Sequence, residues 1–213
     1  MEALLLVDIQ NDFLPGGALA VPEGDRVVPV ANALTPLFEW VVATKDWHPP
    51  NHGSFASQHP GKRVGDTILL DGLEQTLWPD HCVQHTAGAG FAPDLDTQAI
   101  SAVFLKGTDP RIDSYSGFFD NGHRRATGLA DYLRERGINE LYVMGLATDY
   151  CVKFTVLDAL DLGFRVFLVE DGTRGVDIQA GDTARAIETM CRAGARAVPS
   201  ATVIDERRPS SAT

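Results

Sequence analysis

Three residues of types that can do covalent chemistry lie just past predicted strands. Asp8 and Lys106 each follow an apolar strand directly, and Cys151 follows the turn after a third strand. A thiol can act as a nucleophile, a carboxylate can take its proton, and an ammonium can stabilise the charge that develops. Because the carboxyl ends of parallel strands meet at one edge of a sheet, we expect the three side chains to converge. The sequence therefore predicts a base and a nucleophile beside a cation.

Each of these residues also has a purely structural interpretation. A lone cysteine is most often a small buried hydrophobe, and Asp8 with Lys106 could form an ion pair that serves only the fold. Cys151, however, falls in the first turn of a predicted helix at 149–162, where backbone N–H groups and the helix dipole favour a thiolate. The presence of all three at one predicted edge favours the catalytic interpretation.

A second group of polar residues could hold a metal ion. Asp46 and His48 stand two residues apart directly after a predicted strand, so their side chains point the same way in an extended segment. His81 is a third candidate, and one carboxylate with two imidazoles suits a catalytic Zn²⁺, Fe²⁺ or Mn²⁺ that keeps positions open for water. Spacing alone is a weak signal, because a loop histidine is often only a surface or capping residue. His52, four residues past His48, is the reserve candidate.

Short apolar runs alternate with amphipathic segments, which predicts a three-layer α/β/α fold around a parallel sheet. Strands are predicted at 3–7, 40–44, 102–105, 141–144, 165–169 and 195–198. Helices are predicted at 25–37, 128–136, 149–162 and 180–193. The polar residues described above all follow the carboxyl ends of these strands, which is where ligands bind in such sheets.

The chain is predicted to form a single domain over residues 1–204, followed by a disordered tail at 205–213. The stretch from 47 to about 97 is irregular and rich in Pro, Gly, His and Asp. Loops of this length are uncommon in compact domains unless they serve a function. We therefore interpret it as an excursion built around a site.

Composition excludes several classes of partner. The net charge of −11 argues against nucleic acid and anionic membranes. The apolar run 3–7 is too short for a signal-peptide core or a membrane span. The three cysteines, Cys82, Cys151 and Cys191, cannot all pair, so a reducing cytoplasm is expected. Neither a GxGxxG nor a GxxxxGK[ST] motif occurs, which leaves dinucleotide and P-loop interpretations without support.

Six separated motifs, in the same order, resemble the nicotinamidase/pyrazinamidase branch of the isochorismatase-like cysteine hydrolases. They are VDIQNDF at 7–13, ATKDWHPPNHGSF at 43–55, WPDHCV at 78–83, KG at 106–107, YSGF at 115–118 and GLATDYCV at 145–152. The resemblance runs from about residue 3 to residue 200. It implies a six-stranded parallel sheet and a catalytic triad of Asp8, Lys106 and Cys151.

The resemblance also implies a metal held by Asp46, His48 and His81. In some relatives a further residue from the following loop joins the metal, and here His52 lies in that loop. A cis peptide is implied before Ala147. The backbone N–H groups of Ala147 and Cys151 would form an oxyanion hole. Residues that match the aromatic pocket of the family are Phe13, Leu19, Trp78, Tyr115 and Tyr150, although an aromatic residue taken singly is more often part of the core.

The activity implied is deamidation of nicotinamide, and of pyrazinamide, to the acid and ammonia through a thioester on Cys151. One divalent ion would position the pyridine nitrogen, with Zn²⁺ favoured over Fe²⁺ or Mn²⁺, and the pathway would be pyridine-nucleotide salvage. The alternatives are a related cysteine hydrolase of another small amide or ureido acid, and a non-catalytic metal-binding protein with a degenerate site. The sequence leaves open whether the chain acts as a monomer or a homo-oligomer.

Overall fold

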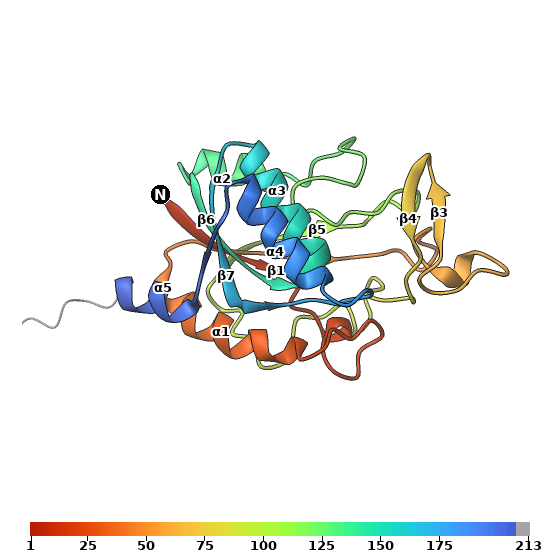
Figure 1. The fold of residues 1–213 in the computed structure, drawn as a ribbon, viewed down its shortest axis with the longest axis horizontal. Helices are drawn as coiled ribbons and strands as arrows, with labels where there is room; N and C mark the ends of the chain where they lie inside the picture. Colours follow the sequence, from red (N-terminus) through yellow and green to blue (C-terminus); the bar gives the residue numbers. More distant parts are fainter. Residues whose placement is uncertain (208–213) are drawn as a thin grey trace, which may run out of the picture.

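A computed structural model of the chain describes residues 1–207, and its centre is a six-stranded parallel sheet (Figure 1). The strand order is β5-β2-β1-β6-β7-β8. The strands are β1 (Glu2–Val7), β2 (Val41–Asp46), β5 (Ile100–Lys106), β6 (Glu140–Leu146), β7 (Arg165–Arg174) and β8 (Arg196–Val198). The predicted α/β architecture is therefore confirmed.

Helices cover both faces of the sheet. On one face, α1 (Val27–Leu34) and α5 (Ser200–Arg207) pack against the side of β1 that carries Leu4 and Leu6. On the other face, α2 (Leu129–Glu135), α3 (Lys153–Asp161) and α4 (Asp182–Ala193) pack against the side that carries Leu5 and Val7. Because both faces are covered, β1 is a continuous apolar run rather than an alternating one. In the part of the chain that the structure describes, no helix has both the length and the apolar character needed to cross a membrane.

The excursion at 47–97 has more regular structure than the sequence indicated. It contains an antiparallel hairpin of β3 (Thr67–Leu70) and β4 (Leu73–Thr76), which projects beyond the edge of the main body (Figure 1). The segments before and after this hairpin hydrogen-bond to each other. The N–H of His48 donates to the carbonyl of Cys82 at 3.0 Å, and the N–H of Trp78 donates to the carbonyl of Ser54 at 2.8 Å. This pairing brings two histidine-bearing segments together although they are more than 30 residues apart in the chain.

Several element boundaries differ from the prediction, and three of these differences concern the site or the end of the chain. β7 runs to Arg174 rather than stopping at residue 169, because its end pairs again with β6 after an irregularity in register. The predicted helix at 149–162 begins as a π-helical turn, Thr148–Val152, before it continues as α3. Residues 205–207, assigned to a tail, are the last turn of α5, and residues 208–213 lie outside the described residues.

The buried central strand generates a stability prediction. Leu5→Ala removes a side chain with no exposed surface from the middle of the sheet, so the free energy of unfolding should fall by about 2–5 kcal/mol. Leu69→Ala on the hairpin is the matched control: Leu69 is 73% exposed, so the change should stay within about 0.5 kcal/mol. Urea denaturation of both variants measures the difference, and equal effects would contradict this account of the core.

Candidate active site

Four residues meet at the carboxyl edge of the sheet, and we call them the strand-end cluster: Asp8, Asp46, Lys106 and Cys151. Asp8 follows β1 directly, while Asp46 and Lys106 are the last residues of β2 and β5 and stand opposite each other in register. Cys151 lies in the turn after β6. All four are buried, with at most 6% of any residue exposed. The structure thus brings together the three residues that the sequence selected for covalent chemistry.

The ammonium of Lys106 is the centre of the strand-end cluster. Its Nζ lies 2.8 Å from Asp8 Oδ2, 2.5 Å from Asp46 Oδ1 and 3.3 Å from Cys151 Sγ. It also donates a hydrogen bond to the carbonyl of Ser114 at 2.9 Å. A buried ammonium is stable only when it is surrounded by such acceptors, so these contacts explain why Lys106 can lie inside the protein.

The two carboxylate oxygens of Asp8 differ in their contacts: Oδ1 accepts a hydrogen bond from a hydroxyl, and Oδ2 is ion-paired with an ammonium. The hydroxyl of Thr44 donates to Asp8 Oδ1 at 2.7 Å. Asp8 Oδ2 is ion-paired with Lys106, but within residues 1–207 it accepts no bond of hydrogen-bond geometry. A carboxylate oxygen of Asp8 and the Sγ of Cys151 lie within 4.8 Å of each other. Asp8 therefore has unused acceptor capacity close to the thiol.

Burial controls the protonation of this cluster. It raises the pKa of the Cys151 thiol well above its ordinary value, and the opposing effect of Lys106 does not overcome it. Burial also raises the pKa of Asp8, again against Lys106. Burial alone would lower the pKa of Lys106, but Asp46 and Asp8 outweigh it and hold the ammonium charged. Burial thus opposes the thiolate that a helix start favours, and the carboxylate beside the thiol is made more basic than usual.

The turn that carries Cys151 has an unusual backbone. The peptide between Leu146 and Ala147 is cis, as the resemblance implied. The carbonyl of Ala147 accepts hydrogen bonds from the N–H groups of Tyr150 and Val152, both at 3.1 Å. The second of these spans five residues, which is the spacing of a π-helix. Such single π turns often occur at functional sites.

The candidate cation site consists of Asp46, His48 and His81. The Nε2 atoms of His48 and His81 lie 3.7 and 3.8 Å from Asp46 Oδ2. One ligand atom from each of the three residues lies within 4.8 Å of the others, and all three residues are buried. One carboxylate and two imidazoles form a donor set that fits a divalent metal ion.

Backbone carbonyls orient both imidazoles of this site. His48 Nδ1 lies 2.9 Å from the carbonyl of Gly107, and His81 Nδ1 lies 2.8 Å from that of Pro79. A carbonyl only accepts, so Nδ1 carries the proton in each ring and Nε2 keeps its lone pair for a metal. Gly107 must be glycine for this contact, because a Cβ there would lie 2.3 Å from Cε1 of His48.

His52, the reserve candidate, lies beside this site rather than within it. Its ring centroid is 4.3 Å from that of His48, and its Nδ1 is 2.7 Å from the hydroxyl of Ser54. Burial lowers the pKa of His52 to about 4, so the ring is neutral at neutral pH. In the described part of the chain its buried Nε2 has no hydrogen-bond partner. The ring of Phe55 packs against all three imidazoles, with centroids 5.5–5.7 Å away.

A narrow inner pocket joins the two groups of residues. Asp46 and His81 of the candidate cation site line it together with Ala147 and Cys151. The five residues selected as a substrate pocket also line it: Phe13, Leu19, Trp78, Tyr115 and Tyr150. A planar ring held here would touch the aromatic walls, the cation site and the thiol at once.

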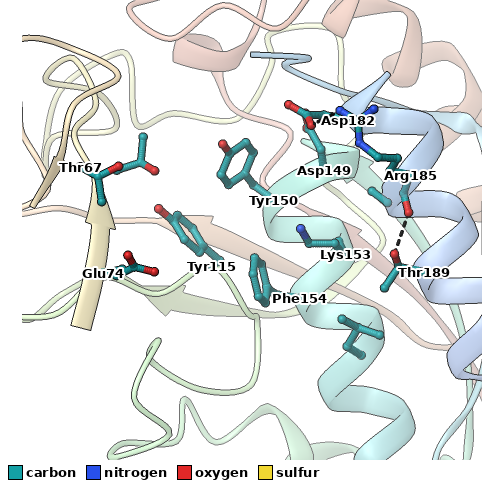
Figure 2. A pocket seen from close by; sticks show the side chains of 13 residues that line it. Thr67, Glu74, Tyr115, Asp149, Tyr150, Lys153, Phe154, Asp182, Arg185 and Thr189 are labelled. Atoms are coloured by element: carbon teal, nitrogen blue, oxygen red, sulfur yellow. Dashed lines mark hydrogen bonds and ion pairs between the residues drawn. The ribbon is translucent and has the colours of Figure 1, made fainter. Parts of the chain in front are cut away.

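An outer cavity of about 630 Å³ adjoins the inner pocket, and the two share Tyr115 and Tyr150. Figure 2 shows these tyrosines between the hairpin, which contributes Thr67 and Glu74, and the helices α3 and α4. The hydroxyl of Tyr115 accepts hydrogen bonds from Trp78 Nε1 at 3.2 Å and from Gln75 Nε2 at 3.1 Å. The tyrosine wall between the two cavities is therefore fixed partly by the hairpin.

The structure adds residues to the site that the sequence analysis did not select. Asp113 and Val176 line the inner pocket, and Thr44 holds Asp8. Gln10 is a buried polar residue two positions past Asp8. The position of Asp8 at the end of an apolar strand made it a candidate, and the same criterion, extended by two residues, selects Gln10. Asp113 follows no strand directly, and nothing in its sequence neighbourhood marks it.

Comparison with known proteins gives a consistent result. The isochorismatase domain family matches residues 2–202. The chain is 60% identical to nicotinamidase of Escherichia coli (strain K12) over 201 residues, which cover 91% of this chain and 92% of the relative. A solved nicotinamidase pyrazinamidase of Acinetobacter baumanii superposes with a TM-score of 0.92 at 46% identity and covers 95% and 97% of the two chains. The pyrazinamidase of Pyrococcus horikoshii, solved in complex with zinc, gives 0.76 at 41% identity, with coverage of 93% and 98%.

The geometry of the candidate cation site predicts which side chains retain metal. Asp46→Ala and His81→Ala each remove one of three converging ligands and should lose stoichiometric metal in elemental analysis of the purified protein. His59→Ala is the control, because His59 bonds the carbonyl of Gly53 and is not among the converging ligands. Full metal content in the Asp46 or His81 variant would show that other residues bind the ion.

Proposed function

This chain belongs to the isochorismatase family, and we propose that it hydrolyses the carboxamide of nicotinamide to nicotinic acid and ammonia. Nicotinamidase relatives at 60% and 43% identity support this activity. The observation that carries the proposal is the buried contact of Lys106 with both Asp8 and Cys151, because Cys151 itself lines an aromatic pocket. Pyrazinamide, which carries the same carboxamide on a similar ring, is the second substrate.

The first bond is formed by Cys151. Its Sγ attacks the carboxamide carbon, and the thiol proton passes to the carboxylate of Asp8, one oxygen of which lies within 4.8 Å of Sγ. A raised pKa at Asp8 makes it a better match for the thiol as a proton acceptor. Lys106 stays charged and offsets the negative charge while sulfur loses its proton. Attack and proton transfer therefore occur together, with no free thiolate in the resting enzyme.

The same carboxylate serves the remaining steps. Asp8 returns its proton to the amide nitrogen, the C–N bond breaks, and ammonia leaves a thioester on Cys151. Water then attacks the thioester carbon, and Asp8 takes a proton from this water. The C–S bond breaks, Asp8 gives this proton to Sγ and so restores the thiol, and nicotinic acid is released. The sum is one amide and one water converted to one acid and one ammonia.

Backbone donors stabilise the oxygen that becomes negative during both attacks. We assign this role to the N–H of Ala147, which belongs to the cis peptide, and to the N–H of Cys151, which lies within the π turn. Loss of one such donor typically costs about 10²–10³ in turnover. The aromatic walls formed by Phe13, Trp78 and Tyr150 hold the ring in place during the reaction, with Leu19 and Tyr115 completing the pocket.

Asp46, His48 and His81 would hold the metal, and His52 beside them is the reserve ligand. When bound, the ion supplies a Lewis acid that coordinates the pyridine nitrogen and so orients the ring. We assign Zn²⁺, which suits two imidazoles and one carboxylate and is present in the pyrazinamidase relative of Pyrococcus horikoshii. The same donor set also accepts Fe²⁺ or Mn²⁺. The aromatic pocket lined by Asp46 and His81 thereby selects ring amides over open-chain ureido acids.

The nucleophile is tested by removing its sulfur. Cys151→Ala should reduce ammonia release from nicotinamide by a factor on the order of 10⁶, the scale seen when a covalent nucleophile is lost. The control is Cys191→Ala, because Cys191 is an exposed free thiol on α4 and should not affect turnover. Undiminished ammonia release from the Cys151 variant would end the covalent proposal.

The metal and the substrate class are tested together with a panel of amides. Nicotinamide should be hydrolysed and ureidoacrylate should not, as measured by ammonia release. Treatment with a chelator should lower turnover of nicotinamide by a factor on the order of 10², since a misplaced ring loses alignment with the thiol, and added zinc should restore it. Preferential hydrolysis of ureidoacrylate would favour the related ureido-acid activity.

A further inference from the structure

The backbone N–H and C=O groups of Asp46, the last residue of β2, have no hydrogen-bond partner in the neighbouring strand β1. The parallel pairing of β1 with β2 ends at Leu6↔Ala43, and Asp8 then turns the chain away with a φ of 49°. Asp46 lies three residues beyond Ala43 and is 4% exposed. Its N–H and C=O would be buried without partners on the β1 side, which proteins rarely tolerate.

The side-chain amide of Gln10 supplies both missing partners. Its Oε1 accepts a hydrogen bond from the N–H of Asp46 at 2.8 Å, and its Nε2 donates to the carbonyl of Asp46 at 2.9 Å. The second N–H of the amide donates to the carbonyl of Ala89 at 3.1 Å. Gln10 is completely buried. The amide thus replaces the peptide group of the strand that has turned away, and it fixes the backbone of one particular residue.

That residue belongs to both chemical groups of the site. Asp46 Oδ1 faces Lys106 at 2.5 Å, and Asp46 Oδ2 faces the Nε2 atoms of His48 and His81. A small rotation of the Asp46 backbone would therefore move the only carboxylate of the candidate cation site. No other side chain in the described residues is seen to hydrogen-bond both backbone groups of Asp46.

The segment that contains Gln10 also holds the loop that bears His81. Two residues further on, Asp12 Oδ2 accepts a hydrogen bond from the N–H of Cys82 at 2.7 Å. The N–H of Asp12 donates to the carbonyl of Gly88 at 3.0 Å. The spacing between Asp46 and His81 is thus set from one short segment that starts at Asp8.

We propose that Gln10 is a positioning residue for the candidate cation site, acting by fixing the backbone of Asp46 so that its carboxylate meets both imidazoles. The inference rests on the proposed function only in taking Asp46 as a metal ligand. Gln10 touches neither substrate nor metal in this account. Its removal should weaken metal binding, as the loss of a residue that orients a ligand typically does, by about 10- to 100-fold.

The test is a direct measurement of zinc affinity on purified protein without substrate, by competition with a chromophoric chelator. Gln10→Met keeps the length of the side chain but removes all three hydrogen bonds, and Gln10→Asn withdraws the same amide by one methylene. Both variants should bind zinc about 10- to 100-fold more weakly than the parent. Adding excess zinc should recover turnover of nicotinamide, which a general loss of folded protein would not allow.

Asn32→Leu is the matched control. Asn32 makes a similar clamp far from the site: its Nδ2 donates to the carbonyl of Asp94 at 2.7 Å and its Oδ1 accepts from the N–H of Asp96 at 2.8 Å. This variant should lose stability without loss of zinc affinity. A folded Gln10→Met protein with zinc affinity within twofold of the parent would overturn the proposal, as would failure of both Gln10 variants to fold. A parent protein that binds no zinc would instead refute the metal role in the proposed function.

Discussion

The buried ammonium of Lys106 is the interaction on which the site depends. A charge inside a protein costs several kcal/mol unless opposite charges and hydrogen-bond acceptors surround it. Here Asp8 and Asp46 both lie within 2.8 Å of Nζ, and a carbonyl completes the shell. The two carboxylates come from the ends of adjacent strands, so the parallel sheet itself places them. Asp46 then extends the arrangement, because its second oxygen faces the imidazoles.

Burial raises the pKa of both the thiol and the carboxylate that take part in the reaction. Burial raises the pKa of the Cys151 thiol well above its ordinary value, and it makes the carboxylate of Asp8 more basic. A proton can therefore pass from the thiol to a carboxylate whose affinity for it is raised, with a fixed cation nearby. The negative charge of the reaction then develops only when a substrate is present to accept the sulfur.

The parts of this arrangement that follow from strand ends could be predicted from sequence. Asp8, Asp46 and Lys106 stand where apolar runs stop, and a parallel sheet brings such positions to one edge. The π turn at Cys151 could not be predicted, since its residues are equally compatible with an ordinary helix start. The hairpin was missed because β3 and β4 pair only with each other and lack the long apolar run of a core strand. Asp113 depends on how the chain after β5 folds back, which no local pattern records.

The hairpin has a consequence for how this scaffold can diverge. Gln75 on β4 reaches the hydroxyl of Tyr115 and the carboxylate of Asp113, so a projecting element shapes one wall of the ring pocket. None of the strand-end residues belongs to that element. Insertions, deletions or exchanges between residues 60 and 76 would therefore change the support of this wall without replacing any residue of the strand-end cluster. One wall of the ring pocket is in this way supported by a stretch of chain that contributes none of the residues that break the bond.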